Sequence, residues 1–106
     1  MSEIKEQVKK LFDRIPRRHS ADNVKEINSI LDSYEDLLKD MEADVRFEKQ
    51  VVPFFESLDP IRATIKKSND NKASKKTKDL LFDEGSSALK ESVEELLQLI
   101  GTGNVG

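Results

Sequence analysis

The stretch VKEINSILDSYEDLLKDM, residues 24–41, shows the clearest periodic pattern of the chain. Its apolar side chains recur every three or four residues, which places them on one face of an α-helix. Acidic residues occupy the opposite face, so we expect one side of this helix to be solvated and the other buried. No stretch of the sequence alternates apolar and polar residues with period two, so the pattern predicts an all-α protein. The apolar positions of the stretch are Val24, Ile27, Ile30, Leu31, Tyr34, Leu37, Leu38 and Met41.

A shorter helix is predicted ahead of this stretch, near the N-terminus. Ser2 is a candidate N-cap for it. Pro16 ends it, because the residue before a proline is pushed out of the helical conformation. Ser20 follows the loop PRRHS and is a candidate N-cap for the helix over 24–41. The apolar face of the first helix consists of Ile4, Val8, Leu11 and Ile15, with Phe12 beside them.

Two prolines interrupt the centre of the chain. A proline fits the start of a helix better than its interior, because its ring removes an N–H that only interior positions need. Pro53 therefore predicts a short helix ending at Leu58, with one member of the pair Phe54–Phe55 in the core. In this interpretation Asp59 caps and Pro60 opens a separate helix, so two short helices meet at a corner.

The C-terminal third contains a polar run and one further helical pattern. Residues 68–78 form either a loop or a loop that runs into a helix capped near Ser74. Residues 80–82 are apolar and predict a return to the core, and Gly85 is a typical helix-ending residue. The last helix is therefore expected to start just after this glycine and to bury Leu89, Val93, Leu96, Leu97 and Ile100.

Length and composition indicate one small domain. A chain of 106 residues with 36% hydrophobic and 37% charged side chains builds one modest core under a charged surface. We predict a single helical domain over residues 1–100, folded as a compact bundle of four to five helices, and a flexible tail over 101–106. The pattern does not determine the handedness of the packing. Cysteine is absent, and neither a signal peptide nor a membrane-length apolar run is found, which predicts a soluble intracellular protein.

Residues suited to catalysis or to metal and cofactor binding are scarce. His19 is the single histidine and stands in a basic loop, where an exposed side chain is the expected state. Zinc sites need several histidine or cysteine ligands, and phosphate-binding loops need clustered glycines before a helix. Paired carboxylates such as Glu94 and Glu95 lie in acidic helical faces that water solvates. We therefore expect no catalytic residue, no metal and no cofactor.

Charge is distributed along the chain in blocks. Residues 32–48 and 79–100 are acidic, whereas residues 62–78 carry seven basic side chains and one acidic one. The basic run Lys66–Lys78 allows three interpretations: a solvated loop, a patch that receives an acidic peptide, or a surface for nucleic acid. The run lacks interleaved aromatic residues for base stacking, and acidic blocks flank it on both sides.

The C-terminal half resembles a known family of helical domains. The run FFESLDPIRATIKKSNDNKASKKTKDLL, residues 54–81, and the run DEGSSALKESVEELLQLI, residues 83–100, are similar to the TFIIS N-terminal domain family. This family includes domains of transcription elongation factors and the integrase-binding domain of the chromatin reader LEDGF. The chain lacks the tryptophan of the family's last helix, and Asn69–Asn71 replaces a glycine of the family. The residues that stand where the family has a corner between helices are Leu58, Pro60, Ile61 and Thr64.

The resemblance implies that the domain docks short motifs of disordered proteins. Such motifs combine acidic residues with a large apolar anchor, and the anchor enters a pocket between two interhelical loops. Those loops correspond here to residues 15–20 and 59–62, and the acidic residue of the family's first loop is not matched. Basic side chains would instead steer an acidic motif toward the pocket. The partner-binding residues expected on these grounds are Ile15, Arg17, Arg18, Phe55, Pro60, Ile61, Arg62 and Lys66.

The sequence therefore predicts a non-enzymatic protein-interaction domain for acidic-apolar linear motifs. The resemblance implies a nuclear location, in transcription elongation or chromatin machinery. The lack of a membrane-length apolar run predicts no membrane association. Three alternatives stand beside this prediction. They are a nucleic-acid-binding module that uses Lys66–Lys78, a BAG-like bundle that binds chaperones, and a structural bundle that dimerises through its acidic second helix or its Phe54–Phe55 face.

Overall fold

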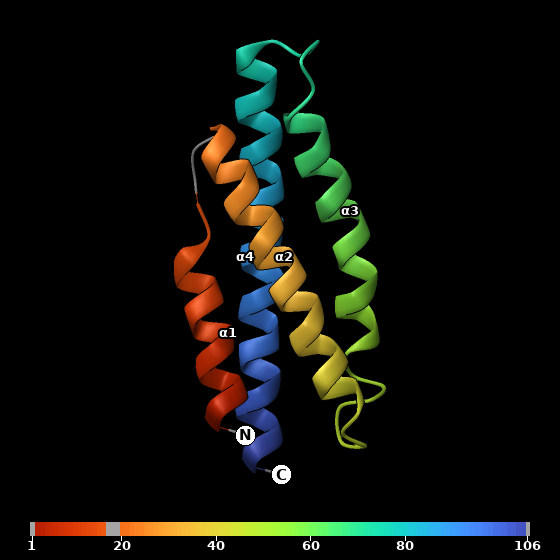
Figure 1. Ribbon diagram of the computed structural model, residues 1–106. Coiled ribbons are helices and arrows are strands. Elements are labelled where there is room, and N and C mark those ends of the chain that lie inside the picture. The colour runs from red at the N-terminus through yellow and green to blue at the C-terminus, as the bar shows by residue number, and fades with distance from the viewer. Residues whose placement is uncertain (1, 17–19, 106) are drawn as a thin grey trace.

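Four helices build the protein (Figure 1). The computed structural model describes residues 2–16 and 20–105 and contains no strand within them. The all-α prediction is therefore confirmed, with a helix count at the lower end of the predicted four to five. The helices are α1 (Ser2–Arg14), α2 (Ala21–Glu42), α3 (Val52–Ser68) and α4 (Lys75–Val105).

Consecutive helices run in opposite directions and pack side by side, and α4 also contacts α1 (Figure 1). Each helix therefore has two neighbours, and α4 lies against both α1 and α3. The molecule measures 48 × 22 × 17 Å along its principal axes, with the helices aligned to the longest one. Because α4 has 31 residues and a helix rises about 1.5 Å per residue, α4 alone spans nearly the whole length.

The predicted boundary between α1 and α2 is confirmed. α1 ends at Arg14, two residues before Pro16. α2 begins directly after Ser20, whose Oγ accepts a hydrogen bond from the backbone N–H of Asn23 at 3.0 Å. This bond satisfies one of the N–H groups that the first turn of a helix leaves without a partner.

One core runs along the inside of the bundle and takes side chains from all four helices. All eight apolar positions predicted for the stretch 24–41 are buried, so the strongest signal of the sequence is confirmed. Phe47 and Val51, in the connection between α2 and α3, add to the core. The other helices contribute the buried side chains Val8, Leu11, Leu58, Ile61, Ile65, Phe82, Leu89, Val93, Leu96 and Ile100.

The corner predicted at Asp59 and Pro60 is wrong, because α3 is one continuous helix with Pro60 inside it. A proline within a helix costs about 3 kcal/mol, since it removes one backbone hydrogen bond and its ring crowds the preceding turn. Pro60 lies on the exposed side of α3, while Leu58, Ile61 and Ile65 form its buried face. Burying each of these three side chains contributes about 1.5–3 kcal/mol, which outweighs the cost of the proline.

The helix end predicted at Gly85 is also wrong. Gly85 is buried within α4, and its φ is not positive. A β-carbon placed on Gly85 would lie 2.5 Å from Cδ1 and 3.0 Å from Cγ1 of Ile65 on α3. Any larger residue here would force the Ile65 side chain to shift, so Gly85 favours the close approach of α3 and α4 and does not end the helix.

Both ends of α4 differ in part from the sequence prediction. Of the two alternatives predicted for residues 68–78, the loop that runs into a helix is confirmed. Ser74 caps this helix, with its Oγ accepting the N–H of Thr77 at 3.2 Å. Leu80 was expected in the core and is instead 62% exposed, whereas Phe82 is fully buried. α4 continues to Val105, so most of the predicted tail is helical, and the flexibility of residues 101–106 stays a prediction.

Candidate functional site

The residues predicted to form one docking pocket lie in separate places. Ile15 and Pro16 line a hollow of about 160 Å³ against the α1-facing side of α4. Pro60 and Ile61 line a second hollow, of about 300 Å³, between α3 and α4. The two hollows share no lining residue among the described residues, so Ile15 does not line the same hollow as Pro60 and Ile61.

Other members of the predicted set are placed as follows. Arg17 and Arg18, together with the loop residue His19, lie outside the described residues. Phe55 is half-buried against the core and lines neither hollow. Ile61 is only 3% exposed, so most of its side chain belongs to the core and only an edge reaches the second hollow.

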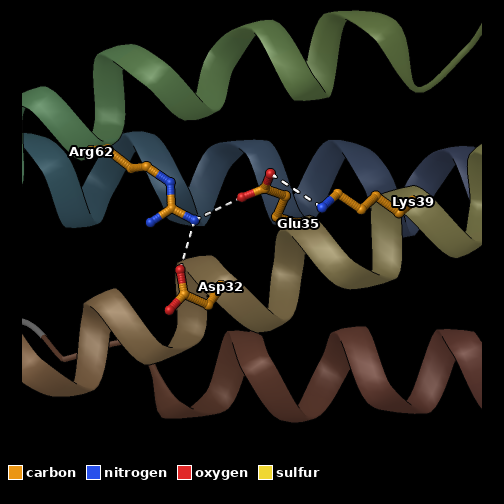
Figure 2. A network of polar contacts seen from close by, with 4 residues as sticks. All are labelled: Asp32, Glu35, Lys39 and Arg62. Atoms are coloured by element: carbon orange, nitrogen blue, oxygen red, sulfur yellow. Dashed lines mark hydrogen bonds and ion pairs between the residues drawn. The ribbon is translucent and has the colours of Figure 1, made fainter.

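Arg62 points toward α2 and is held there by two carboxylates (Figure 2). Its Nη2 donates to Oδ1 of Asp32 at 2.9 Å and to Oε1 of Glu35 at 3.0 Å. Lys39 extends the network, with its Nζ 3.8 Å from the other oxygen of Glu35. The Arg62 guanidinium therefore connects α3 to the acidic face of α2, where two carboxylates balance its charge.

Three lysines of the basic run, Lys66, Lys67 and Lys72, line a hollow at the end of the bundle where α3 gives way to α4. This basic hollow has a volume of about 670 Å³ and is lined by Ala63, Lys66, Lys67, Asn69, Asp70, Asn71 and Lys72. The connecting turn is ordered by Asp70, whose Oδ1 accepts the backbone N–H of Lys72 at 3.0 Å. Among the described residues, no lysine between positions 66 and 78 forms an ion pair. The described lining of the basic hollow therefore has three lysines against one aspartate, Asp70, with Ala63 as its apolar residue.

The hollow between α3 and α4 lies above a chain of three hydroxyl groups that was not predicted from the sequence. Tyr34 Oη and Ser92 Oγ are 2.8 Å apart, and Ser92 Oγ is 3.3 Å from Ser57 Oγ. The Ser57 hydroxyl donates to the backbone carbonyl of Phe54 at 2.8 Å. A signal for this network existed in the sequence, because Ser92 stands between Leu89 and Leu96 on a helical stripe that is otherwise apolar.

Burial raises the pKa of Tyr34 well above its ordinary value of 10.0. The hydrogen bond to Ser92 works in the opposite direction, and the charge of Glu95 adds to the effect of burial. Tyr34 therefore stays protonated at any physiological pH and keeps its proton for hydrogen bonding.

The chain was compared with protein-family models, with curated proteins and with solved structures, and none of them matches it. Within residues 2–16 and 20–105, no helix has both the length and the apolar character needed to cross a membrane. The same residues include no cluster of three or more side chains able to hold a metal ion. The candidate sites are therefore the basic hollow and the hollow between α3 and α4.

Proposed function

We propose that the chain is a non-enzymatic protein-interaction domain that docks acidic-apolar segments of disordered partners at the basic hollow. One observation supports this most directly: Lys66, Lys67 and Lys72 line a hollow of about 670 Å³ without a carboxylate partner in the described chain. An acidic segment supplies the missing counter-charge, and such complementarity raises the association rate of a specific partner.

The first turn of α4 adds to this positive field. It begins with Lys75 and Lys76 and contains no acidic residue. The N-terminus of a helix carries a partial positive charge of about half an elementary charge, so lysines there reduce the stability of the helix. Helix stability alone does not account for lysines in the first turn of α4. A negatively charged ligand at this end of the bundle would make these positive charges favourable.

An apolar contact is available in the same region. Leu80 is 62% exposed and lies one helical turn after Lys76, so the two side chains occupy one face of α4. A motif that joins acidic residues to an apolar anchor matches this pairing of lysine and leucine. Among the expected partner-binding residues that the structure describes, only Lys66 lines the basic hollow. The nuclear setting in transcription or chromatin machinery, which the resemblance implies, belongs to the same proposal.

The test is an amide NMR titration of the isotope-labelled chain with an acidic peptide that contains phenylalanine, run in parallel with a short DNA duplex. We expect the peptide to shift the signals of residues 66–80 and the DNA to leave them largely unchanged. The variant Lys67→Gln/Lys72→Gln should bind the peptide about fivefold or more weakly, because two favourable charge contacts are lost.

The matched control is Lys9→Gln/Lys25→Gln, which removes the same charge from exposed positions on α1 and α2. It should bind the peptide as the unaltered chain does. Equal weakening by both variants would mean that net charge, and not the basic hollow, attracts the peptide. Shifts that appear with DNA alone and vanish as the salt concentration rises would assign the lysines to nucleic acid.

A further inference from the structure

The hollow between α3 and α4 has a chemistry opposite to that of the basic hollow. Its volume is about 300 Å³, at the lower end of the range for ligand pockets. Its apolar walls are Pro53, Phe54, Pro60, Ile61 and Ala88, and its polar lining is Ser57, Ser92, Glu91 and Glu95. No basic residue lines it. We refer to it as the acidic hollow.

The hydroxyl groups of the acidic hollow have no proton to offer a ligand. A serine or tyrosine hydroxyl carries one proton and accepts through two lone pairs. When all three contacts are made at once, the Ser57 proton is donated to the carbonyl of Phe54 and Ser92 is the donor in its contact with Ser57. The Ser92 proton is then also in use, and Tyr34 donates to Ser92. Ser57 and Ser92 each keep one lone pair, so toward the hollow both are acceptors only.

The carboxylates of the acidic hollow are acceptors as well. Glu91 and Glu95 lie one turn apart on the same face of α4, and both are exposed. Neither forms an ion pair within the part of the chain that the structure describes. A ligand that matches this lining must bring hydrogen-bond donors and positive charge, together with an apolar portion for the walls.

We propose that the acidic hollow binds a basic side chain, lysine or arginine, from a segment of a partner protein. Its aliphatic stem lies along Phe54, Pro60 and Ile61, as long basic side chains do on apolar surfaces. Its charged end reaches Glu91 and Glu95, and its N–H groups donate to the spare lone pairs of Ser57 and Ser92. A volume of about 300 Å³ accommodates one long side chain and little more. This site is separate from the basic hollow, and the opposite charge of its ligand allows the two proposals to be tested independently.

The test uses two peptides of identical length, one with arginine beside leucine and one in which citrulline replaces the arginine. Citrulline has nearly the same shape as arginine but no charge. We expect the arginine peptide to shift the amide signals of residues 54–61 and 88–95, and the citrulline peptide to bind at least about fivefold more weakly. The variant Glu91→Gln/Glu95→Gln should show the same loss for the arginine peptide.

The control variant is Glu94→Gln, which removes a neighbouring charge on α4 that does not line the hollow. It should bind the arginine peptide nearly as the unaltered chain does. Equal affinity for the two peptides, or no shift at millimolar peptide, would overturn the proposal. Self-association that depends on concentration and is abolished by Glu91→Gln/Glu95→Gln would also overturn it, since the occupant would then be the basic end of a second copy.

Discussion

The interface between α3 and α4, which we call the seam, is packed closely at one end and open at the other. Near Gly85 the two helices approach so closely that a single added carbon would collide with Ile65. Farther along, around Ser57 and Ser92, the same helices leave a hollow of about 300 Å³ above a hydrogen-bonded chain. The tight end contains Gly85 and the open end contains Pro60. The sequence predicted a helix boundary at each of these residues, but both lie inside a continuous helix. At the tight end the missing side chain of Gly85 permits the close approach, whereas at the open end Pro60 lines the hollow.

The tight end of the seam should be the most sensitive to substitution. Gly85→Leu is expected to lower the free energy of unfolding by about 3 kcal/mol, because the new side chain must displace Ile65 from a close-packed core. The measurement is chemical denaturation followed by circular dichroism. Glu84→Leu is the control, because it places the same side chain at the neighbouring exposed position and should change stability by less than about 0.5 kcal/mol.

A double-mutant cycle sharpens this result. Ile65→Val removes Cδ1, the atom nearest to the position of the added carbon. Gly85→Ala should therefore be more favourable in the Ile65→Val background than in the unaltered chain, with a coupling of about 1 kcal/mol. Additive effects would show that the contact between Gly85 and Ile65 does not limit how closely the helices approach.

The open end of the seam should tolerate, and even gain from, loss of its proline. Pro60→Ala restores a backbone N–H within α3 and removes the crowding of the ring, so the chain should become about 2 kcal/mol more stable. Denaturation measured under the same conditions checks this. Pro53→Ala is the matched control, because Pro53 lies in the first turn of α3, where a proline costs little. A loss of stability in Pro60→Ala would mean that the ring packs in a way that outweighs the missing hydrogen bond.

Breaking the hydrogen-bonded chain of Tyr34, Ser92 and Ser57 should lower stability least at neutral pH. At alkaline pH it should also change how stability depends on pH. Tyr34→Phe removes one buried hydrogen bond and should cost about 1 kcal/mol near pH 7. The pKa of Tyr34 is raised on folding, so above its ordinary value of 10.0 the unfolded chain loses a proton that the folded chain retains. Stability of the unaltered chain should therefore fall as pH rises above that value, by up to about 1.4 kcal/mol per pH unit from this group.

The Tyr34→Phe variant is also the control for the pH dependence of stability. Tyr34 is the only tyrosine of the chain, so phenolate absorbance reports this one group without ambiguity. Tyr34→Phe should lack the part of the alkaline slope that comes from the phenol, while the contribution of the lysines remains. An identical slope in both proteins would show that Tyr34 titrates normally and that its hydroxyl is not held in the core.

The sequence was sufficient where structure depends on local chemistry. The apolar period of residues 24–41, the stop before Pro16 and the cap at Ser20 each depend on neighbours within a few positions, and all three are confirmed. Pro60 and Gly85 were misinterpreted because the decisive contacts come from a different helix. A single sequence does not show that one glycine faces one isoleucine across a seam.

The candidate sites were also predictable where they depend on nearby residues and unpredictable where they depend on contacts between helices. The basic run was visible as composition, and three of its six lysines line one hollow. Arg62 was counted with them, but its partners Asp32 and Glu35 lie about thirty positions away, and only folding brings them together. The acidic hollow was not anticipated, because its serines and glutamates lie on two helices whose relative rotation the apolar pattern did not fix.

The position of α4 has a consequence for how the protein is made. α4 is the last of the four helices to be synthesised, yet it packs against both α1 and α3. At about 5–20 residues per second, its 31 residues take roughly 2–6 s to appear. During that interval the apolar faces of the three earlier helices have no partner to cover them completely. The nascent chain is therefore most exposed to chaperones, and to aggregation, just before its own last helix closes the bundle.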